Sequence, residues 1–173
     1  MDHQASEQRF RALHQDTFAD LLRFVQRRVP DDEAEDVVST VYLTAWRRLG
    51  DLPEDARPWL FAVARRVMAN QTRGWLRRKA LDVRLTSTEK PQGHDESLGA
   101  AARLDLQRAW RTLSAADREA LALVGFDGLT AEQAATVLGC RRSTFAMRLS
   151  RARQRLQAAL EPADTRPTLQ EQS

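Results

Sequence analysis

The chain has 173 residues, of which 42% are hydrophobic and 29% are charged, and its formal net charge is +3. This length fits one medium domain or two small ones, and the mixture of apolar and charged residues argues against a wholly disordered chain. No apolar run approaches the about 18 residues that cross a membrane, and no signal-peptide pattern opens the chain, so we expect a cytoplasmic protein without membrane insertion.

The N-terminal part predicts three helices, because apolar residues recur at spacings of three and four. Pro30 ends the first, and the acidic cluster at residues 31–36 suits the start of the second. Residues 50–57 have the composition of a loop, and Pro58 is well placed in the first turn of the third helix. The expected ranges are about 6–29, 31–49 and 58–78.

Apolar periodicity is lost over residues 86–97 (TSTEKPQGHDES), which predicts a linker. Four further helices are expected beyond it, at about 99–112, 115–126, 131–138 and 142–160. Strand signals are nearly absent, so we predict an all-α fold with two small helical domains, joined by a flexible linker that leaves their relative orientation mobile. The expected divisions are 1–80, a linker at 81–100, 101–160 and a disordered tail at 161–173.

The second domain carries a helix-turn-helix pattern. Thr130 and Gln133 have the spacing of a capping box, and Gly139 ends a short helix just before a basic one. In that last helix Phe145, Leu149, Ala152 and Leu156 form the expected buried stripe. The opposite face, which we expect to enter a DNA major groove, holds Ser143, Met147, Ser150, Arg151 and Gln154, flanked by Thr144, Arg148 and Arg155.

The third helix has two different faces. Leu60, Phe61, Ala64, Met68 and Trp75 form its buried side. The other face is polar and cationic, with Trp59, Arg66, Asn70, Arg73 and Arg77. Such a face suits an opened DNA strand, because arginines follow phosphates and an aromatic ring stacks on an unpaired base. Ordinary core packing remains an equal alternative for Trp59.

The second helix presents apolar residues to solvent. Val38, Val41, Ala45 and Leu49 point one way, which leaves Leu43 and Trp46 exposed. Polar residues surround these two, namely Asp36, Ser39, Thr40 and Arg47. Large apolar side chains ringed by polar ones indicate a protein interface. Packing of Trp46 on the first helix or the linker is the alternative.

Cationic residues gather in two stretches. Residues 56–81 hold seven cations and no acid, and residues 128–160 hold six arginines with Glu132 as the only acid. Arginine suits phosphates and guanine edges, so nucleic acid is the expected partner, with plain solvated helix faces as the alternative.

Cys140 is the single cysteine, and His3, His14 and His94 have no metal-ligand spacing, so no disulfide, zinc or other cofactor is expected. We interpret Cys140 as a small apolar residue at a helix turn.

The run LSAADREALALVGFDGLTAEQAATVLGCRRSTFAMRLSRARQRL resembles the fourth conserved region of bacterial RNA polymerase sigma factors. The runs AEDVVSTVYLTAWRRL and RPWLFAVARRVMANQTRGWLRR resemble the second region. The ECF (extracytoplasmic-function) group has this layout, with both regions and only a short linker between them. The resemblance implies an initiation factor, not an enzyme, that binds core RNA polymerase and promoter DNA.

The resemblance also implies roles for residues. Minus-thirty-five DNA would be read by Arg141, Arg142, Ser143, Thr144, Met147, Arg148, Ser150 and Arg151. Minus-ten DNA would meet Trp59, Arg66, Asn70, Arg73 and Arg77, with a flipped base captured by the loop at residues 50–57. The clamp coiled coil of the largest polymerase subunit would meet Asp36, Ser39, Thr40, Leu43, Trp46 and Arg47. The flap of the second-largest subunit and an anti-sigma factor are further implied partners.

Four departures from the family pattern occur at these sites. The family often has Gln-Glu or Gln-Asp at Ser39-Thr40, Asn at Arg66, Ser at Arg141 and Lys-Ser at Ala146-Met147. The last two imply an unusual minus-thirty-five preference. Arg141 also removes the expected N-cap of the recognition helix, a loss of ~1 kcal/mol, and Ser143 is the alternative cap for a later start.

Two other classes of function were weighed. A stand-alone helix-turn-helix regulator would use residues 1–78 for sensing or dimerisation and would bind a two-fold DNA site. The second cationic stripe and the lack of a ligand-pocket pattern argue against it. A nuclease is disfavoured, because no carboxylates or histidines occur at metal-binding spacing.

Overall fold

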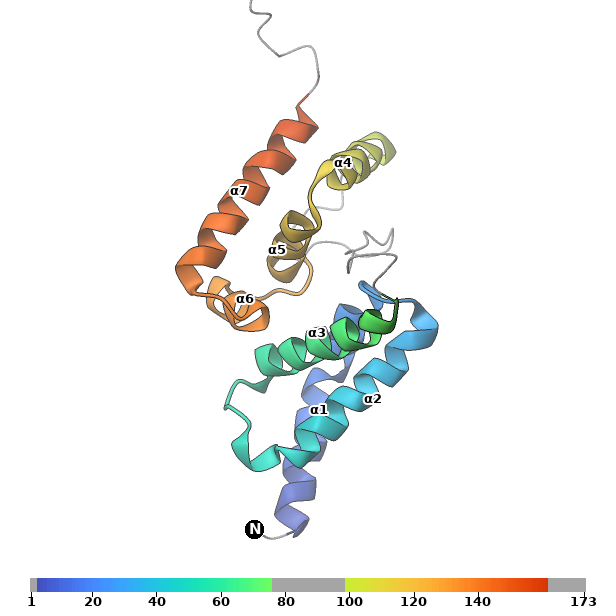
Figure 1. Ribbon diagram of the computed structural model, residues 1–173, viewed down its shortest axis with the longest axis vertical. Coiled ribbons are helices and arrows are strands. Elements are labelled where there is room, and N and C mark those ends of the chain that lie inside the picture. Colours follow the sequence, from blue (N-terminus) through green and yellow to red (C-terminus); the bar gives the residue numbers. More distant parts are fainter. Residues whose placement is uncertain (1–2, 76–98, 162–173) are drawn as a thin grey trace, which may run out of the picture.

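The computed structural model describes residues 3–75 and 99–161, which form an N-terminal and a C-terminal helical unit (Figure 1). The N-terminal unit contains α1 (His3–Gln26), α2 (Asp31–Arg47), a 3-10 helix (Leu49–Asp51) and α3 (Ala56–Trp75). The C-terminal unit contains α4 (Ala100–Thr112), α5 (Ala115–Gly125), α6 (Ala131–Leu138) and α7 (Arg142–Leu160). No β-strand occurs within these described ranges, and the expected all-α class is confirmed.

The helix ends agree with expectation to within a few residues. α1 stops at Gln26 instead of Val29, because residues 27–29 form a tighter turn in which the Arg28 N–H donates to the Val25 carbonyl at 2.8 Å. α2 stops at Arg47, and the chain continues into the 3-10 helix. The linker expected at residues 86–97 and the tail beyond residue 161 lie outside the described residues.

Apolar faces of α1, α2 and α3 form the core of the N-terminal unit. Phe24 of α1 and Phe61 of α3 are fully buried, and their rings stack with centroids 4.3 Å apart. Leu60, Ala64 and Met68 are buried beside them. The buried side expected for the third helix is therefore confirmed, apart from Trp75, whose side chain is not described.

One face of α7 packs against the rest of the C-terminal unit. Phe145, Leu149 and Ala152 are buried, and the half-buried Leu156 packs against a small cluster around Trp110. The expected stripe is thus confirmed, and it fixes which face of α7 meets solvent.

The turn of the helix-turn-helix forms as its sequence indicates. The Thr130 N–H donates to Gln133 Oε1 at 2.9 Å, and the Gln133 N–H donates to Thr130 Oγ1 at 3.2 Å, which completes the capping box. Gly139 closes α6 with φ +64°, a left-handed conformation that glycine adopts without a Cβ clash.

The two units pack directly on each other. Figure 1 shows α3 between the α1–α2 pair and α6, and one cluster of buried apolar residues continues across the boundary. The sequence led us to expect mobile relative orientation. In this structure buried ion pairs and packed helices join the units, and the mobility itself stays a prediction.

Asp117 ties α5 to α7. Its carboxylate accepts from Ser114 Oγ at 2.7 Å and from Arg155 Nη1 at 2.7 and 2.9 Å. Burial of the carboxyl acts to raise its pKa, but the bonds from Ser114 and Arg155 and the charge of Arg155 outweigh it. The pKa of Asp117 therefore lies below its ordinary value of 3.8.

We predict that Asp117→Asn lowers the free energy of unfolding by about 1–2 kcal/mol at pH 7, because it removes a charge-assisted bond to a largely exposed arginine. A carboxyl with a lowered folded pKa stabilises the protein above its unfolded pKa and loses that effect as the pH falls through the folded value. The difference between wild type and variant should therefore shrink toward pH 3. Urea unfolding over pH 3–7 measures it, with Asp105→Asn, in the exposed pair with Arg108, as control. A pH-independent difference would contradict the prediction.

Candidate nucleic-acid and polymerase interface

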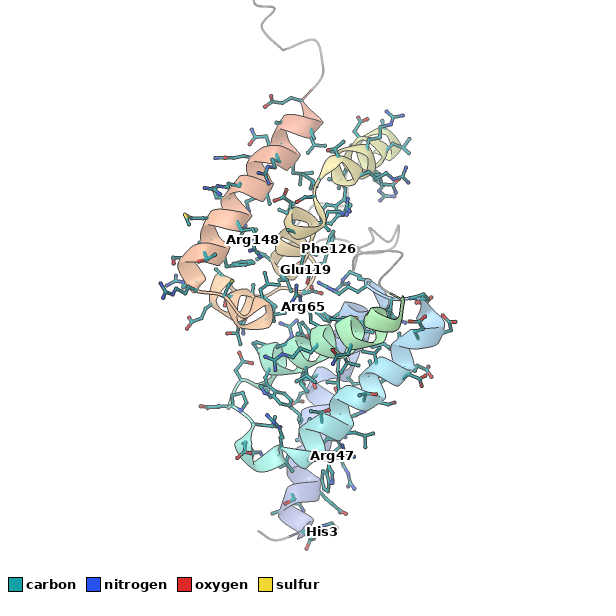
Figure 2. All side chains as sticks on the ribbon, in the orientation of Figure 1. His3, Arg47, Arg65, Glu119, Phe126 and Arg148 are labelled. Atoms are coloured by element: carbon teal, nitrogen blue, oxygen red, sulfur yellow. The ribbon has the colours of Figure 1, made fainter. Side chains whose placement is uncertain are left out.

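The solvent face of α7 carries the residues expected to read DNA. Arg148 is half-buried and is labelled on α7 in Figure 2. The exposed members of the set are Arg141, Arg142, Ser143, Thr144, Met147, Ser150 and Arg151. Met147 is 57% exposed, unusual for a large apolar side chain, and suits contact with a thymine methyl group.

A pocket of about 290 Å³ lies between the start of α5 and this face of α7. Its lining residues are Ser114, Ala116, Asp117, Thr144, Met147, Arg148, Arg151 and Arg155. Asp117 forms an ion pair with Arg155. Within the described residues, no carboxylate forms an ion pair with the other two lining cations, Arg148 and Arg151. Their charges and the first turn of α5 together favour an anionic group there.

The start of α7 lacks a side-chain cap. Arg141 occupies the N-cap position and makes no capping hydrogen bond, in line with its replacing the family's serine. Ser143 is the second residue of the helix and does not cap it, so the later start considered from the sequence is wrong. The first N–H groups of α7 therefore remain available at the exposed end of the helix.

The face of α3 expected to meet minus-ten DNA is partly accessible. Arg66 and Asn70 are exposed, whereas Trp59 is half-buried and packs against the core. The alternative of core packing therefore holds in part for Trp59, and its contact with DNA stays a prediction. The side chain of Arg73 and the whole of Arg77 lie outside the described residues.

The loop expected to capture a flipped base contacts the C-terminal unit. Gln133 Nε2 donates to Asp55 Oδ2 at 2.7 Å, and Arg57 Nη2 donates to the Asp127 carbonyl at 2.6 Å. Arg57 Nε also lies 2.9 Å from Asp20 Oδ2. Two hydrogen bonds thus join this loop to the helix-turn-helix unit, which the sequence did not indicate.

The outward face of α2 has the expected composition. Leu43 is 58% exposed and Trp46 is 37% exposed. Their polar neighbours Asp36, Ser39, Thr40 and Arg47 are all exposed as well. Figure 2 places Arg47 at the end of α2 that is remote from the C-terminal unit. Arg47 therefore lies away from the boundary between the units.

Trp46 also packs within its own unit. Its ring meets the Phe10 ring of α1 edge-on, with centroids 5.1 Å apart. The expectation of exposure and the alternative of packing on the first helix both apply, because the indole contacts rings of α1 while 37% of the residue remains exposed.

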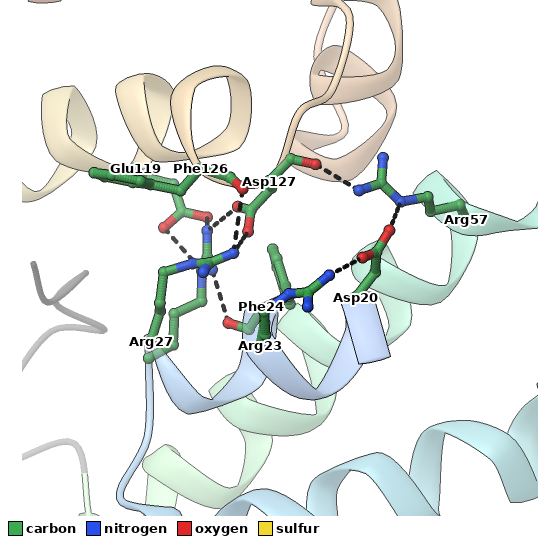
Figure 3. A network of polar contacts seen from close by, with 9 residues as sticks. Asp20, Arg23, Phe24, Arg27, Arg57, Glu119, Phe126 and Asp127 are labelled. Atoms are coloured by element: carbon green, nitrogen blue, oxygen red, sulfur yellow. Dashed lines mark hydrogen bonds and ion pairs between the residues drawn. The ribbon is translucent and has the colours of Figure 1, made fainter. Parts of the chain in front are cut away.

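A buried network between the units was missed at the sequence level (Figure 3). Arg27 Nη2 lies 2.6 Å from Asp127 Oδ1, and Arg28 Nη2 lies 3.0 Å from Asp127 Oδ2. Arg28 also donates to both oxygens of Glu119 at 3.4 Å. These partners lie 91 to 100 residues apart, so no local pattern connects them. The only sequence signal was the pair of adjacent arginines at the end of a helix.

Residues 3–75 and 99–161 contain no group of three or more His, Cys, Asp or Glu side chains that could hold a metal ion. None of the helices in those ranges is long and apolar enough to cross a membrane. Cys140 is half-buried against the core at the turn before α7, which agrees with its interpretation as an apolar residue.

Comparison with known families identifies the family of this chain. The model described as Sigma-70 region 2 matches residues 13–82, and the one described as Sigma-70, region 4 matches residues 103–156. The ECF RNA polymerase sigma factor SigL of Mycobacterium tuberculosis is 33% identical over 156 residues, covering 87% of this chain and 88% of SigL. This chain belongs to the ECF sigma factors of RNA polymerase.

Two solved structures agree with this sigma factor in fold. One is the sigma factor RpoE in complex with the anti-sigma factor NepR from Bartonella quintana, with a TM-score of 0.60, 28% identity and coverage of 86% of this chain and 96% of that one. The other is CnrH in complex with the cytosolic domain of CnrY, with a TM-score of 0.59, 26% identity and coverage of 91% and 92%. As a sigma factor, the chain directs promoter-specific initiation of transcription by core RNA polymerase.

Proposed function

We propose that this sigma factor divides its work between three surfaces. The exposed face of α7 reads the minus-thirty-five element, the polar face of α3 with the loop at residues 50–57 opens and holds the minus-ten element, and the outward face of α2 binds the polymerase clamp. The observation that carries the proposal is the composition of α7, whose buried stripe turns Met147 and Arg151 outward beside Arg148. A major groove accepts such a helix.

The domain assignment follows the same division. Residues 1–80 form the clamp-binding and minus-ten unit, residues 101–160 the minus-thirty-five unit, with a linker at 81–100 and a tail at 161–173. The matched ranges 13–82 and 103–156 support these boundaries. We further propose contact of the C-terminal unit with the flap of the second-largest subunit, a cytoplasmic location, and no enzymatic activity.

An anti-sigma factor is a further proposed partner. Both solved relatives described above are complexes, RpoE with the anti-sigma factor NepR and CnrH with the cytosolic domain of CnrY. The exposed apolar side chains on α2 suit a second protein, since exposed aromatic and aliphatic anchors dominate binding energy at interfaces. Competition between the polymerase clamp and such a regulator for α2 would follow directly.

The proposed function is tested by reconstitution. Purified chain and core polymerase should co-elute, and the mixture should transcribe from a promoter selected from a random library that core alone ignores. Binding of the chain alone to a two-fold DNA site as a dimer, without polymerase, would instead support the regulator class.

Leu43 is predicted to anchor the clamp contact. Leu43→Ala should weaken binding to core polymerase at least fivefold, because a central apolar anchor contributes roughly 1–2 kcal/mol. Thermal stability should stay unchanged, since the side chain is 58% exposed. Titration of labelled chain with core polymerase measures the effect. Leu104→Ala on α4, at 52% exposure, is the matched control and should bind normally. Equal affinities of the Leu43→Ala and Leu104→Ala variants for core polymerase would show that Leu43 on α2 does not anchor the interface.

Arg151 and Arg153 are predicted to act differently although both are exposed. Arg151 lies beside Met147 on the pocket side of α7 and should reach a base edge, most plausibly guanine, whereas Arg153 should reach only phosphate. Arg151→Ala should cost ~1–3 kcal/mol and flatten preference at one base pair, and Arg153→Ala should weaken all sequences alike and lower the salt slope by about one.

The measurement is initiation across a library of minus-thirty-five variants at two salt concentrations. Equal losses on every sequence for both substitutions would make Arg151 a purely electrostatic contact. Specificity would then have to come from Arg148, from the start of α7 or from DNA shape.

A further inference from the structure

An acidic residue, Asp117, lies on the side of the C-terminal unit that is expected to face DNA. It lines the pocket between α5 and α7 together with the three arginines Arg148, Arg151 and Arg155. The side chain of Asp117 is 5% exposed, whereas that of Arg155 is 60% exposed. A carboxylate at this place repels DNA phosphates and cannot itself contact them, so its effect on DNA must come through the residue that it binds.

Two features fix the position of the Asp117 carboxylate. Ser114 Oγ donates to Asp117 Oδ2 at 2.7 Å, and the Asp117 N–H donates to Ser114 Oγ at 3.1 Å. Asp117 also lies in the first turn of α5, where the helix dipole favours a negative charge. The carboxylate is therefore an anchored partner, and a side chain that binds it is held at one place.

Arg155 is the side chain that Asp117 holds. Its Nη1 atom donates to Oδ1 at 2.9 Å and to Oδ2 at 2.7 Å. Arg148, Arg151 and Arg155 follow one another at spacings of three and four residues, so they share one face of α7. Two of these three cations are left for DNA, and the third is bound within the protein.

The place of Arg155 along α7 indicates what it would contact if it were released. Residues near the N-terminal end of a recognition helix contact base edges. Arg155 lies about 10 Å farther along the helix axis than Arg148, toward the C-terminal end of α7. A guanidinium there is expected to reach a backbone phosphate, a contact that carries no sequence information.

We propose that Asp117 is a positioning residue that withholds Arg155 from the DNA backbone, which leaves Arg148 and Arg151 as the cations of the pocket that contact promoter DNA. The proposal rests on the proposed reading of the minus-thirty-five element by α7. Asp117 and a DNA phosphate compete for the same guanidinium. If Arg155 left, the Asp117 carboxylate would stay buried without its cation, which is a costly arrangement. The competition therefore favours Asp117.

The consequence for function is a weaker attraction to DNA of any sequence. Each contact between a cation and a phosphate adds affinity that depends on salt and not on the bases. Withholding one such contact lowers the affinity of α7 for all DNA. A larger share of its binding energy then comes from contacts with base edges, among them the one predicted for Arg151.

A double-mutant cycle tests the proposal in the full-length chain, reconstituted with core polymerase. The four proteins are wild type, Asp117→Asn, Arg155→Gln and the variant with both changes. Their affinities are measured for duplex promoters that differ in the minus-thirty-five element, at several salt concentrations. Contacts made by the polymerase are common to all four proteins, so the differences report on Asp117 and Arg155.

Asp117→Asn should bind every sequence about three- to tenfold more tightly and should increase the salt slope by about one, since Arg155 gains a phosphate. Arg155→Gln alone should change affinity by less than about twofold and leave the slope unchanged, because a withheld side chain makes no contact to lose. The double variant should match Arg155→Gln. A purely structural role for Asp117 predicts the opposite sign, because loss of structure weakens binding.

Asp105→Asn is the matched control, since it also removes a carboxylate that binds an arginine, in the exposed pair with Arg108 on α4. It changes the net charge by the same amount and should bind as wild type. Circular dichroism shows whether each variant is folded. The proposal is overturned if folded Asp117→Asn binds no more tightly than wild type, or if its gain persists in the double variant. A salt slope lowered by Arg155→Gln alone would also overturn it.

A second measurement needs no substitution. Phenylglyoxal modifies neutral guanidine groups, and an ion pair favours the protonated form. In the free wild-type chain, Arg155 should react at least threefold more slowly than Arg151, although both residues are exposed. Equal rates, followed by mass spectrometry, would show that Asp117 does not hold Arg155. If the wild-type complex with polymerase binds all minus-thirty-five variants equally, the proposed reading by α7 fails instead, and the reactivity of Arg155 alone decides whether Asp117 holds it.

Discussion

The pairing of Arg27 and Arg28 with Asp127 and Glu119 is the interaction on which the arrangement of the whole molecule depends. Removing one partner from a buried ion pair typically costs about 3–5 kcal/mol, because the other charge is left in a low-dielectric environment. Asp127 serves two arginines through its carboxylate and a third, Arg57, through its carbonyl. Asp127 therefore joins three arginines of the N-terminal unit to the loop that leads into α6, and α6 itself packs on α3.

The same physics limits how much these ion pairs stabilise the contact between the units. Desolvation offsets much of the attraction within a buried pair, so the net stabilisation of the closed state is smaller than the number of contacts suggests. What the pairs give is direction, since only one orientation brings each guanidinium to its carboxylate.

The exposed face of α7 depends on apolar packing as well as on an ion pair. Phe145, Leu149 and Ala152 fix the rotation of α7, and Asp117 restrains it further by holding Arg155. Arg155 was expected to flank the DNA-facing set and instead has an intramolecular partner. The cations of α7 therefore differ in role although they share one helix, because a single carboxylate on α5 selects one of them.

Most of the fold and the composition of the candidate sites could be predicted from the sequence. The stripe on α7, the capping box at Thr130 and Gln133, and the outward Leu43 arise from periodicities of three and four residues, which are local properties of a helix. The half-buried state of Trp59 and the edge contact between Trp46 and Phe10 could not be predicted, since each depends on a neighbouring helix. The buried network of Arg27, Arg28, Glu119 and Asp127 could not be predicted for the same reason. Arg28 looks like any arginine at a helix end until the tertiary structure brings Asp127, 99 residues away, to within 3.0 Å.

Sequence by itself therefore determined the helices, their apolar faces and the family, because these depend on neighbours along the chain. Only the tertiary structure decided which charges are buried together and that the two units close on each other, because burial and Coulomb attraction act between groups that the sequence keeps far apart.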